Sequence, residues 1–418
     1  MTARGPARRL VWAVVLCSLV VKLAGVAYMQ RYLAWNLVAP DTRDQYRPLA
    51  VSLVEGRGYQ FHGDHADATR IAPGFPVFLA AIYGVAGPDA PTWLIGAINA
   101  VLRTLTTIVV FALASRAFGG WAAWWAAVVH ALDPWEAFWT AFVLKESLAV
   151  LLSVFAMLAV ASALESPTFI RGIAAGVAIA VAALTRYASL GLAGAAIALV
   201  VWRRHALRSG GAVRLAVTLA AGLVIGLAPW LVRNAGVYGR PMLYLHSGYA
   251  FYVSNGPGTE RVRDTSGYAG SSAIDASASA DVARRHPGPV ERDAAYLAAA
   301  TAHAASHPLE TALTAGARLA NMWRPTFAGA SAINVLVLGG SHVVLLIAAV
   351  VGWRVDWKHG GDAPARAVVY AAVGFYLLLH LLFWSEIRYR QYVTPFLAMF
   401  AGVAADAAWR RWSRSAIA

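Results

Sequence analysis

Cysteine is almost absent from this chain. The single cysteine, Cys17, lies inside the first apolar run, so no intrachain disulfide can form and segments outside a membrane must be held by packing alone. Charge is scarce as well, because only 13% of the 418 residues are charged and 59% are hydrophobic. A chain with so few charges cannot keep most of its surface in water. The scarcity of charge and the high apolar content predict an integral membrane protein.

Acidic residues are the rarer of the charged types. The chain has 21 Asp and Glu against 35 Lys and Arg, which gives a formal net charge of +14. In a membrane protein, Lys and Arg collect in cytoplasmic loops, so this surplus reports topology and does not require a nucleic acid partner. We therefore predict no nucleic acid partner.

Long apolar runs take the place of charge and predict an all-α polytopic fold. The first run is a full span of roughly 20 residues, and no A-x-A-like site precedes RYLAW, so we expect an uncleaved helix and not a signal peptide. Runs of about 17 to 25 mostly apolar residues, with a few slightly shorter ones, predict about ten transmembrane helices. They fall at 10–30, 93–115, 119–134, 138–163, 170–185, 188–202, 213–232, 332–352, 366–384 and 390–408.

The basic residues predict the orientation of these spans. A cytoplasmic N-terminus puts every short basic connection on the cytoplasmic side, as the positive-inside rule requires. Both termini are then cytoplasmic, and two long segments, 31–92 and 233–331, lie outside. The clusters counted are Arg8 and Arg9; Arg116; Arg171; Arg203, Arg204, Arg208 and Arg214; Arg354, Lys358 and Arg366; and Arg410, Arg411 and Arg414.

Three regions follow from this topology. Residues 1–235 form a transmembrane module that includes the first outer loop 31–92, residues 236–331 form an extracytoplasmic region with helices, and residues 332–418 form the C-terminal transmembrane helices. No internal repeat at a fixed period is present in the sequence.

The first outer segment begins with a charged stretch at residues 39–59, APDTRDQYRPLAVSLVEGRGY. From Tyr46, the residues Leu49, Leu53 and Val54 share one helical face, which predicts an amphipathic helix on the outer membrane surface. Asp41 and Asp44 would then lie near the end of the first span. Either aspartate alone could equally be a helix N-cap.

The remaining outer stretches predict further elements. Residues 71–87, IAPGFPVFLAAIYGVAG, are apolar but short, which predicts an interfacial or re-entrant helix. Residues 258–288 are rich in Ser, Ala, Gly and charge and are interpreted as a flexible loop. The Ala-rich stretch after that loop predicts two outer helices broken at Pro308.

Charges inside the apolar runs are the second candidate for chemistry. Arg103, Lys145 and Glu146 could share a depth and pair with one another, either as a structural ion pair or in a substrate site. Asp133 and Glu136, on either side of Pro134, are predicted to be turn and cap residues.

The third candidate is a ring of arginines at outer span ends. Guanidinium groups bind phosphate bidentately and keep their charge, so such a ring suits a lipid phosphate, although interfacial arginines also reach headgroups without any function. The residues are Arg186, Arg233, Arg388 and Arg390. A divalent-metal site formed by His62, Asp64, His65 and Asp67 is an alternative, although a polar turn is the favoured interpretation of FHGDHAD.

A series of motifs resembles one family in order and in membrane placement. The motifs are DTRDQYRPLAVSLVEGRGY, TRIAPGFPVFLA, LKESLAVLL, LTRYASL, APWLVRN and RYRQYVTPFLAMFAG. Together they resemble bacterial membrane glycosyltransferases of the GT-C fold, in the branch of the protein mannosyltransferases and of the aminoarabinose transferase that modifies lipid A. The resemblance covers nearly the whole chain and is faint across the second outer loop.

This resemblance implies a donor sugar on a polyprenyl phosphate, an extracytoplasmic acceptor, and the bacterial cytoplasmic membrane as the location. It implies an acidic residue of the first outer loop that acts on the acceptor, which by position is Asp41. Four residues separate Asp41 from Tyr46, one more than is usual in the family, so Asp44 stays an alternative. The outer loops would roof a cavity, with a candidate substrate-binding set of Arg43, Tyr46, Arg70, Arg103, Glu146, Arg186, Arg233, Arg388 and Arg390.

The chemistry needs few groups. A carboxylate takes the proton of an acceptor hydroxyl, and cations stabilise the leaving phosphate, so direct displacement with inversion requires no second, nucleophilic carboxylate. A lipid or solute transporter and a non-catalytic relative of the same fold are the competing interpretations.

Overall fold

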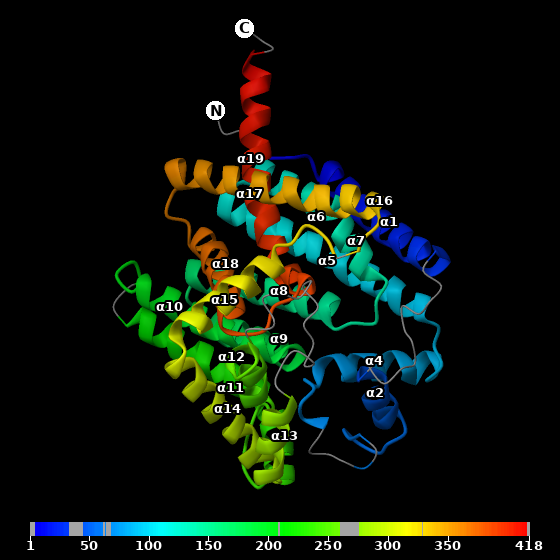
Figure 1. The fold of residues 1–418 in the computed structure, drawn as a ribbon. Helices are drawn as coiled ribbons and strands as arrows, with labels where there is room; N and C mark the ends of the chain where they lie inside the picture. The colour runs from blue at the N-terminus through cyan, green and yellow to red at the C-terminus, as the bar shows by residue number, and fades with distance from the viewer. Residues whose placement is uncertain are drawn as a thin grey trace.

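The computed structural model describes residues 5–32, 45–61, 63, 68–207, 210–259, 276–327 and 329–415. Every regular element in these ranges is a helix (Figure 1), so the all-α prediction is confirmed.

Six helical segments of the described residues are long and apolar enough to cross a membrane, and the protein is a multi-pass membrane protein. They are α1 (Arg8–Tyr32), α5 (Thr92–Phe118), α8 (Glu146–Glu165), α11 (Gly211–Tyr238), α18 (Pro364–Leu382) and a composite of α16 (Ala332–Asn334), η4 (Val335–Gly339) and α17 (Gly340–His359).

The other expected spans correspond to helices outside this set. Six of the ten expected runs match the long segments, and the remaining four fall on elements that are shorter or carry more charge. These elements are α6 (Gly120–Leu132), α9 (Phe169–Thr185), η1 (Tyr187–Leu190) with α10 (Gly191–Trp202), and α19 (Thr394–Ser415).

The expected span 138–163 is wrong at its start. A separate helix α7 (Pro134–Thr140) comes first, and α8 begins only at Glu146. Asp133 caps α7, because its Oδ1 accepts a hydrogen bond from the backbone N–H of Trp135 at 3.0 Å, and Pro134 occupies the first turn. The cap prediction for Asp133 is confirmed. Because the chain breaks after α7, Lys145 and Glu146 lie at the N-terminus of α8.

The basic connections gather at one end of the helices. Arg203, after α10, pairs with Asp362 before α18 at 2.7 Å, and Arg116, at the end of α5, pairs with Glu165 at the end of α8 at 3.2 Å. Both terminal helices reach the same end, because Trp124 of α6 donates to the carbonyl of Leu10 and its neighbour Trp125 lies against Trp409 of α19. The short basic connections therefore lie at one end of the bundle; which side of the membrane this end faces stays a prediction.

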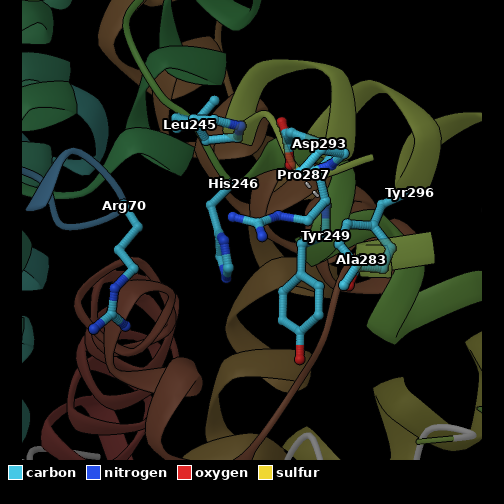
Figure 2. A pocket seen from close by; sticks show the side chains of 10 residues that line it. Arg70, Leu245, His246, Tyr249, Ala283, Pro287, Asp293 and Tyr296 are labelled. Carbon is cyan, nitrogen blue, oxygen red and sulfur yellow. Dashed lines mark hydrogen bonds between the residues drawn. The ribbon is translucent and has the colours of Figure 1, made fainter. Parts of the chain in front are cut away.

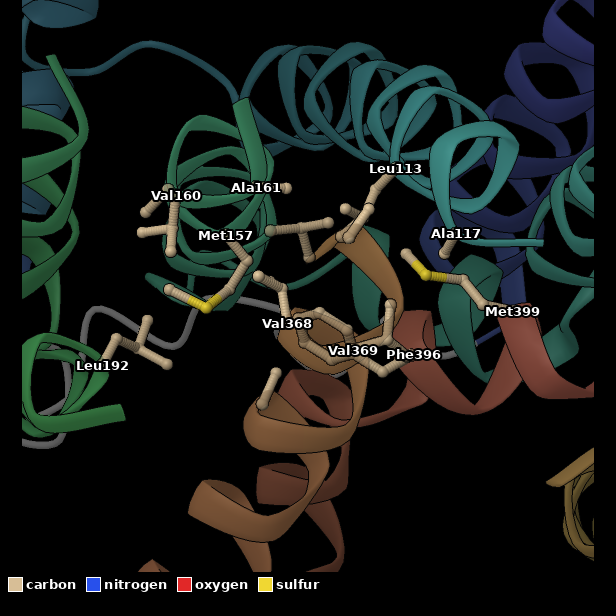
Figure 3. Packing of buried hydrophobic residues seen from close by; sticks show 14 of the residues in the cluster. Leu113, Ala117, Met157, Val160, Ala161, Leu192, Val368, Val369, Phe396 and Met399 are labelled. Carbon is tan, nitrogen blue, oxygen red and sulfur yellow. The ribbon is translucent and has the colours of Figure 1, made fainter. Parts of the chain in front are cut away.

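The main hydrophobic core lies where α5, α8, α10, α18 and α19 meet. Figure 3 shows Leu113 of α5 and Met157 of α8 facing Val368 of α18 and Phe396 of α19. Several alanines of these helices, among them Ala149 and Ala372, are fully buried beside the larger side chains, which lets the backbones approach closely. This core fixes the outer ends of α8 and α19 relative to each other.

Helices α9 and α11 pack through paired small-residue motifs. Gly172 and Gly176 are four residues apart on α9, as are Gly222 and Gly226 on α11, and a methyl group at Gly176 would overlap the carbonyl oxygen of Leu219. Close backbone approach through such motifs is a main source of helix association in membranes. The contact holds Arg186, at the end of α9, against the rest of the bundle.

We expect Gly176→Ala to destabilise the protein by about 1–3 kcal/mol, because the added methyl must push α9 away from α11. Gly194→Ala on α10 is the matched control, since no heavy atom lies within 4 Å of the added methyl. Removing a glycine from a helix by itself stabilises by about 0.5–1 kcal/mol, so the control should be neutral or slightly more stable. Thermal unfolding in one detergent measures both; equal melting temperatures would contradict the close contact.

The first outer segment packs on protein and not on the membrane surface. Helix α2 (Tyr46–Val54) contacts α4 (Gly74–Ala86), and Figure 1 shows the two side by side. Leu49 is fully buried in a cluster with Tyr59 and Trp230 of α11. Leu53 packs against the same cluster, and of the predicted face only Val54 is exposed. The predicted lipid-facing side of α2 is therefore wrong for Leu49 and Leu53, which are covered by Tyr59 and by Trp230 of α11.

The second outer segment forms a helical lobe of α12 (Ser247–Asn255), α13 (Ala276–Arg285), α14 (Pro289–Ser306) and α15 (Pro308–Met322). The break at Pro308 is confirmed. The loop expected at 258–288 is wrong over α13, whose small residues form a helix packed on α14; residues 260–275 lie outside the described ranges. Buried Arg318 of α15 donates to Leu381 of α18 and to Ser254 and Asn255 of α12, which attaches the lobe to the bundle.

Candidate functional site

A buried carboxylate lies at the N-terminus of α8, the end opposite the basic connections. Glu146 is 2% exposed, and its Oε1 lies 3.5 Å from Nε of Arg388. Arg388 belongs to η5 (Ile387–Tyr392), the turn that leads into α19. Glu146 occupies the first turn of its helix, where the positive end of the helix dipole favours a negative charge. Its second oxygen, Oε2, is buried and has no hydrogen-bond partner among the described residues, so part of this charge is unsatisfied.

Arg388 keeps its positive charge at this position. Burial alone would lower its pKa, but the neighbouring Glu146, Tyr389 and Glu386 raise that pKa well above the usual value. The second carboxylate, Glu386, lies 3.6 Å from Arg388 Nη2. The side chain of Arg388 is 29% exposed, so it faces an open space as well as Glu146.

Arg186 approaches the same place from the end of α9. Its guanidinium carbon lies 3.7 Å from the ring centroid of Tyr392 and 5.0 Å from that of Tyr389, while Arg388 lies 5.3 Å from the same Tyr389 ring. Two guanidinium groups therefore flank one tyrosine ring. Stacking satisfies a guanidinium face but not its N–H groups, and Nη1 of Arg186 is buried with no hydrogen-bond partner among the described residues.

A third cation comes from the residue before α8. The ammonium of Lys145 lies 5.9 Å from the ring centroid of Tyr46 and forms no hydrogen bond or ion pair with a described residue. Tyr46 itself is fixed by an edge-on contact with Phe75 of α4, at 5.0 Å between ring centroids. The first outer segment is thus brought against the N-terminus of α8.

Arg103 is buried next to these residues, and its guanidinium nitrogens all donate hydrogen bonds to protein side chains. Within α5 it is 1% exposed, and its guanidinium donates to Glu136 Oε2 at 2.5 Å, to Ser147 Oγ at 3.1 Å and to the side chain of Gln391. The expected pairing of Arg103 with Glu146 is wrong, because Glu136 takes that place. The prediction of Glu136 as a turn or cap residue is also wrong, since its carboxylate is buried beneath α7. Arg103 joins the first turn of α8 to η5 and so holds Glu146 opposite Arg388.

Comparison with known proteins identifies the fold of this chain. Residues 68–232 match the family model described as dolichyl-phosphate-mannose-protein mannosyltransferase. The archaeal oligosaccharyltransferase AglB from Archaeoglobus fulgidus, solved with an inhibitory peptide and a dolichol-phosphate, superposes with a TM-score of 0.55 at 13% identity over 96% of this chain. Its apo form gives a TM-score of 0.56 at 14% identity over 96% of this chain and 51% of its own. The chain has the GT-C fold.

The match in length is partial. The chain covers 50% of the archaeal structure with dolichol-phosphate, so it spans about half the length of that protein. ArnT from Cupriavidus metallidurans, solved with undecaprenyl phosphate, gives a TM-score of 0.47 at 15% identity, covering 96% of this chain and 78% of its own. No curated protein matches the chain in sequence.

Within this GT-C fold, the predicted ring of four arginines divides. Arg186 and Arg388 converge beside Tyr389, whereas Arg390 stacks on Trp135 at 4.0 Å and donates to the carbonyl of Arg324. Arg233 donates to Thr69 Oγ1 at 2.7 Å and to the carbonyl of Tyr59 at 2.8 Å. The ring is therefore wrong as a single cluster: Arg233 ties the first outer segment to α11, and Arg390 anchors η5.

The remaining predicted site residues lie elsewhere or fall outside the described part of the chain. Arg70 donates to Gln45 Oε1 at 3.1 Å and lines a cavity of the outer lobe. Asp41, Arg43 and Asp44 lie outside the described residues, as do His62, Asp64, His65 and Asp67. In the part of the chain that is described, no group of three or more His, Cys, Asp or Glu side chains could hold a metal ion.

Three residues of the site were missing from the predicted set. The sequence marks Lys145 only as a charge within an apolar run. In the motif RYRQY, the predicted site included the two arginines but not Tyr389 or Tyr392. The spacing of that motif was the available signal: Arg388, Tyr389 and Tyr392 lie within one short turn, so a single element can present a guanidinium and two rings to the same space.

Proposed function

We propose that the chain is a glycosyltransferase that moves a sugar from a polyprenyl-phosphate donor to an acceptor hydroxyl on the extracytoplasmic face of a bacterial cytoplasmic membrane. The observation that carries this proposal is the unsatisfied buried Nη1 of Arg186 beside Arg388 and Lys145. A buried guanidinium donor without a partner is costly, so a ligand with acceptor oxygens is expected at that point. The GT-C fold and the family match over 68–232 support the same reaction class.

The charges of the site suit a phosphate as a leaving group. Lys145, Arg186 and Arg388 supply three positive charges against the carboxylates of Glu146 and Glu386. Departure of the sugar turns a phosphodiester with one negative charge into a phosphate with nearly two. Cations held in place beforehand therefore stabilise the transition state more than the bound donor, which is the requirement for catalysis.

The reaction is a direct displacement. The acceptor oxygen attacks the anomeric carbon as the bond from that carbon to the phosphate oxygen breaks, the polyprenyl phosphate leaves with the electron pair, and a carboxylate takes the hydroxyl proton. We assign this base to Asp41 or Asp44. Asp44 immediately precedes Gln45, which meets Arg70, and Tyr46, which meets Lys145. Inversion at the anomeric carbon follows from a single displacement.

Transfer of radiolabelled sugar in membranes tests the base. Wild type is compared with Asp41→Asn and Asp44→Asn, which keep size and remove the charge. General-base catalysis contributes roughly 10²–10⁴-fold, so one of the two variants should lose that much activity and the other far less. Near wild-type transfer by both variants would contradict the assignment of a first-loop aspartate as the base.

A further inference from the structure

The outer lobe contains a cavity separate from the buried cations. Its volume is about 530 Å³, and its walls come from the start of α12, from the turn between α13 and α14, and from Arg70 of the first outer segment. Figure 2 shows Arg70 on one side and His246, Tyr249 and Asp293 on the other. A cavity of this size accommodates one or two sugar rings.

The cavity presents positive charge. Arg292 lines it, is half-buried, and forms no side-chain hydrogen bond or ion pair with a described residue. The carboxylate of Asp293 also lines the cavity, where it accepts hydrogen bonds from the backbone N–H of Tyr249 at 3.0 Å and from Ser247 Oγ at 3.3 Å at the start of α12. The lining therefore holds two guanidinium groups, those of Arg70 and Arg292, against one carboxylate. With Arg70 on the opposite wall, the lining favours a ligand that carries negative charge.

Aromatic rings connect this cavity to the cation site. Tyr187, next to Arg186 in the chain, lies 4.4 Å from Tyr244 between ring centroids. The row continues from Tyr244 to His246 at 6.2 Å and from His246 to Tyr249 at 4.5 Å. Burial raises the pKa of the Tyr244 hydroxyl, and the charges of Asp293 and Arg70, which line the cavity, also act on that group. Tyr244 thus lies between the two sites.

Such a row suits a saccharide. A sugar ring has an apolar face of C–H groups that packs on an aromatic face, and a rim of hydroxyls that needs polar partners. His246 and Tyr249 line the cavity and are only partly buried, so their rings can supply the first kind of contact, and the guanidinium groups supply the second. Tyr296 serves as the floor, because it is buried and its hydroxyl is bonded to Ser279.

We propose that this cavity is the acceptor subsite and that the acceptor is an anionic saccharide, a sugar chain that carries carboxylate or phosphate groups. This inference rests on the proposed function, since an acceptor exists only if the chain transfers a sugar. The ring row leads the acceptor hydroxyl toward Arg186, while Arg292 and Arg70 hold the negative groups of the chain.

Binding to the full-length protein in detergent tests the inference without any transfer. The probes are tetragalacturonate, which is anionic, and maltotetraose, which is neutral, and saturation-transfer NMR gives both affinities. Wild type should bind tetragalacturonate at least 10-fold more tightly than maltotetraose. Arg292→Gln should weaken tetragalacturonate binding by roughly 10- to 100-fold, as expected for loss of a charged hydrogen bond. Arg292→Lys should restore part of the affinity.

Arg240→Gln is the matched control, because Arg240 is an exposed outer arginine after α11 that does not line the cavity. Undecaprenyl phosphate binding reports folding of every variant and should stay unchanged. Equal tetragalacturonate affinity in Arg292→Gln and Arg240→Gln, or no preference of wild type for the charged probe, would overturn this inference alone. Saccharide binding as expected with no sugar transfer would instead overturn the proposed function.

Discussion

Arg186→Gln is expected to weaken binding of undecaprenyl phosphate by roughly 10- to 100-fold, because a buried guanidinium bonded to a phosphate is worth about 1.5–3 kcal/mol. The guanidinium is already held by stacking on Tyr392 at 3.7 Å, so little entropy is lost when the lipid phosphate binds. Glutamine keeps a hydrogen-bond donor and loses the charge. Sugar transfer should fall at least as far as binding, since the positive charge also stabilises the leaving phosphate.

The control for this prediction is Arg204→Gln. Arg204 is exposed and belongs to the basic end, so its replacement changes the net charge equally without approaching the site. Arg186→Lys should give an intermediate affinity, because an ammonium keeps the charge but not the planar fork. Titration of each variant in nanodiscs with undecaprenyl phosphate provides the comparison. Identical dissociation constants for Arg186→Gln and Arg204→Gln would remove Arg186 from the site.

Arg103→Met is expected to destabilise the protein by about 3–5 kcal/mol, the usual result of leaving one member of a buried ion pair without its partner. Glu136 would then be a buried carboxylate without its hydrogen-bonded cation, with His130 Nε2 at 3.7 Å and Lys22 as neighbours. Ser147 and Gln391 would lose their common donor. Because those two contacts fix α8 relative to η5, the separation of Glu146 and Arg388 should also become less constrained.

The double variant Arg103→Met with Glu136→Met distinguishes the stability lost to an unpaired buried charge from the effect of losing the contacts to Ser147 and Gln391. Replacing both members of a buried pair by apolar residues is often neutral for stability, so the double variant should regain most of the thermal stability that Arg103→Met loses. Its undecaprenyl phosphate affinity should remain below that of wild type, because the contacts to Ser147 and Gln391 are still absent. Melting temperatures that fall additively would contradict the ion-pair account, and full recovery of affinity would contradict the positioning role.

Much of the fold follows from apolar runs and turn residues. Six long segments, the break at Pro308 and the cap at Asp133 are set by local properties that one sequence displays. The break between α7 and α8 is different, because residues 135–144, WEAFWTAFVL, are mostly apolar and carry a single charge, Glu136. Hydropathy cannot reveal that a helix stops inside such a run, and the stop is what places Lys145 and Glu146 at the N-terminus of α8.

The site was harder to predict, because its contacts join distant parts of the chain. Arg103 meets Gln391 across 288 positions, and no local pattern reports such a pair. Arginine at a span end has the same appearance whether it faces a phosphate, as proposed for Arg186, or ties loops together, as Arg233 does. The prediction that α2 lies on the membrane surface fails for a related reason: periodicity identifies Leu49 as buried but does not say whether lipid or protein, here Tyr59 and Trp230, covers it.

The central claim is that this GT-C chain transfers a sugar. The most direct measurement uses purified wild-type protein in proteoliposomes, with undecaprenyl-phosphate hexoses and pentoses labelled with ¹⁴C in the sugar, and follows the label in both the lipid and the acceptor fractions. The account predicts that the label leaves the polyprenyl phosphate and becomes covalently attached to the acceptor, and that Arg186→Gln suppresses this transfer. Label that crosses the bilayer while still attached to the polyprenyl phosphate, with none on an acceptor, would contradict the account and identify a transporter.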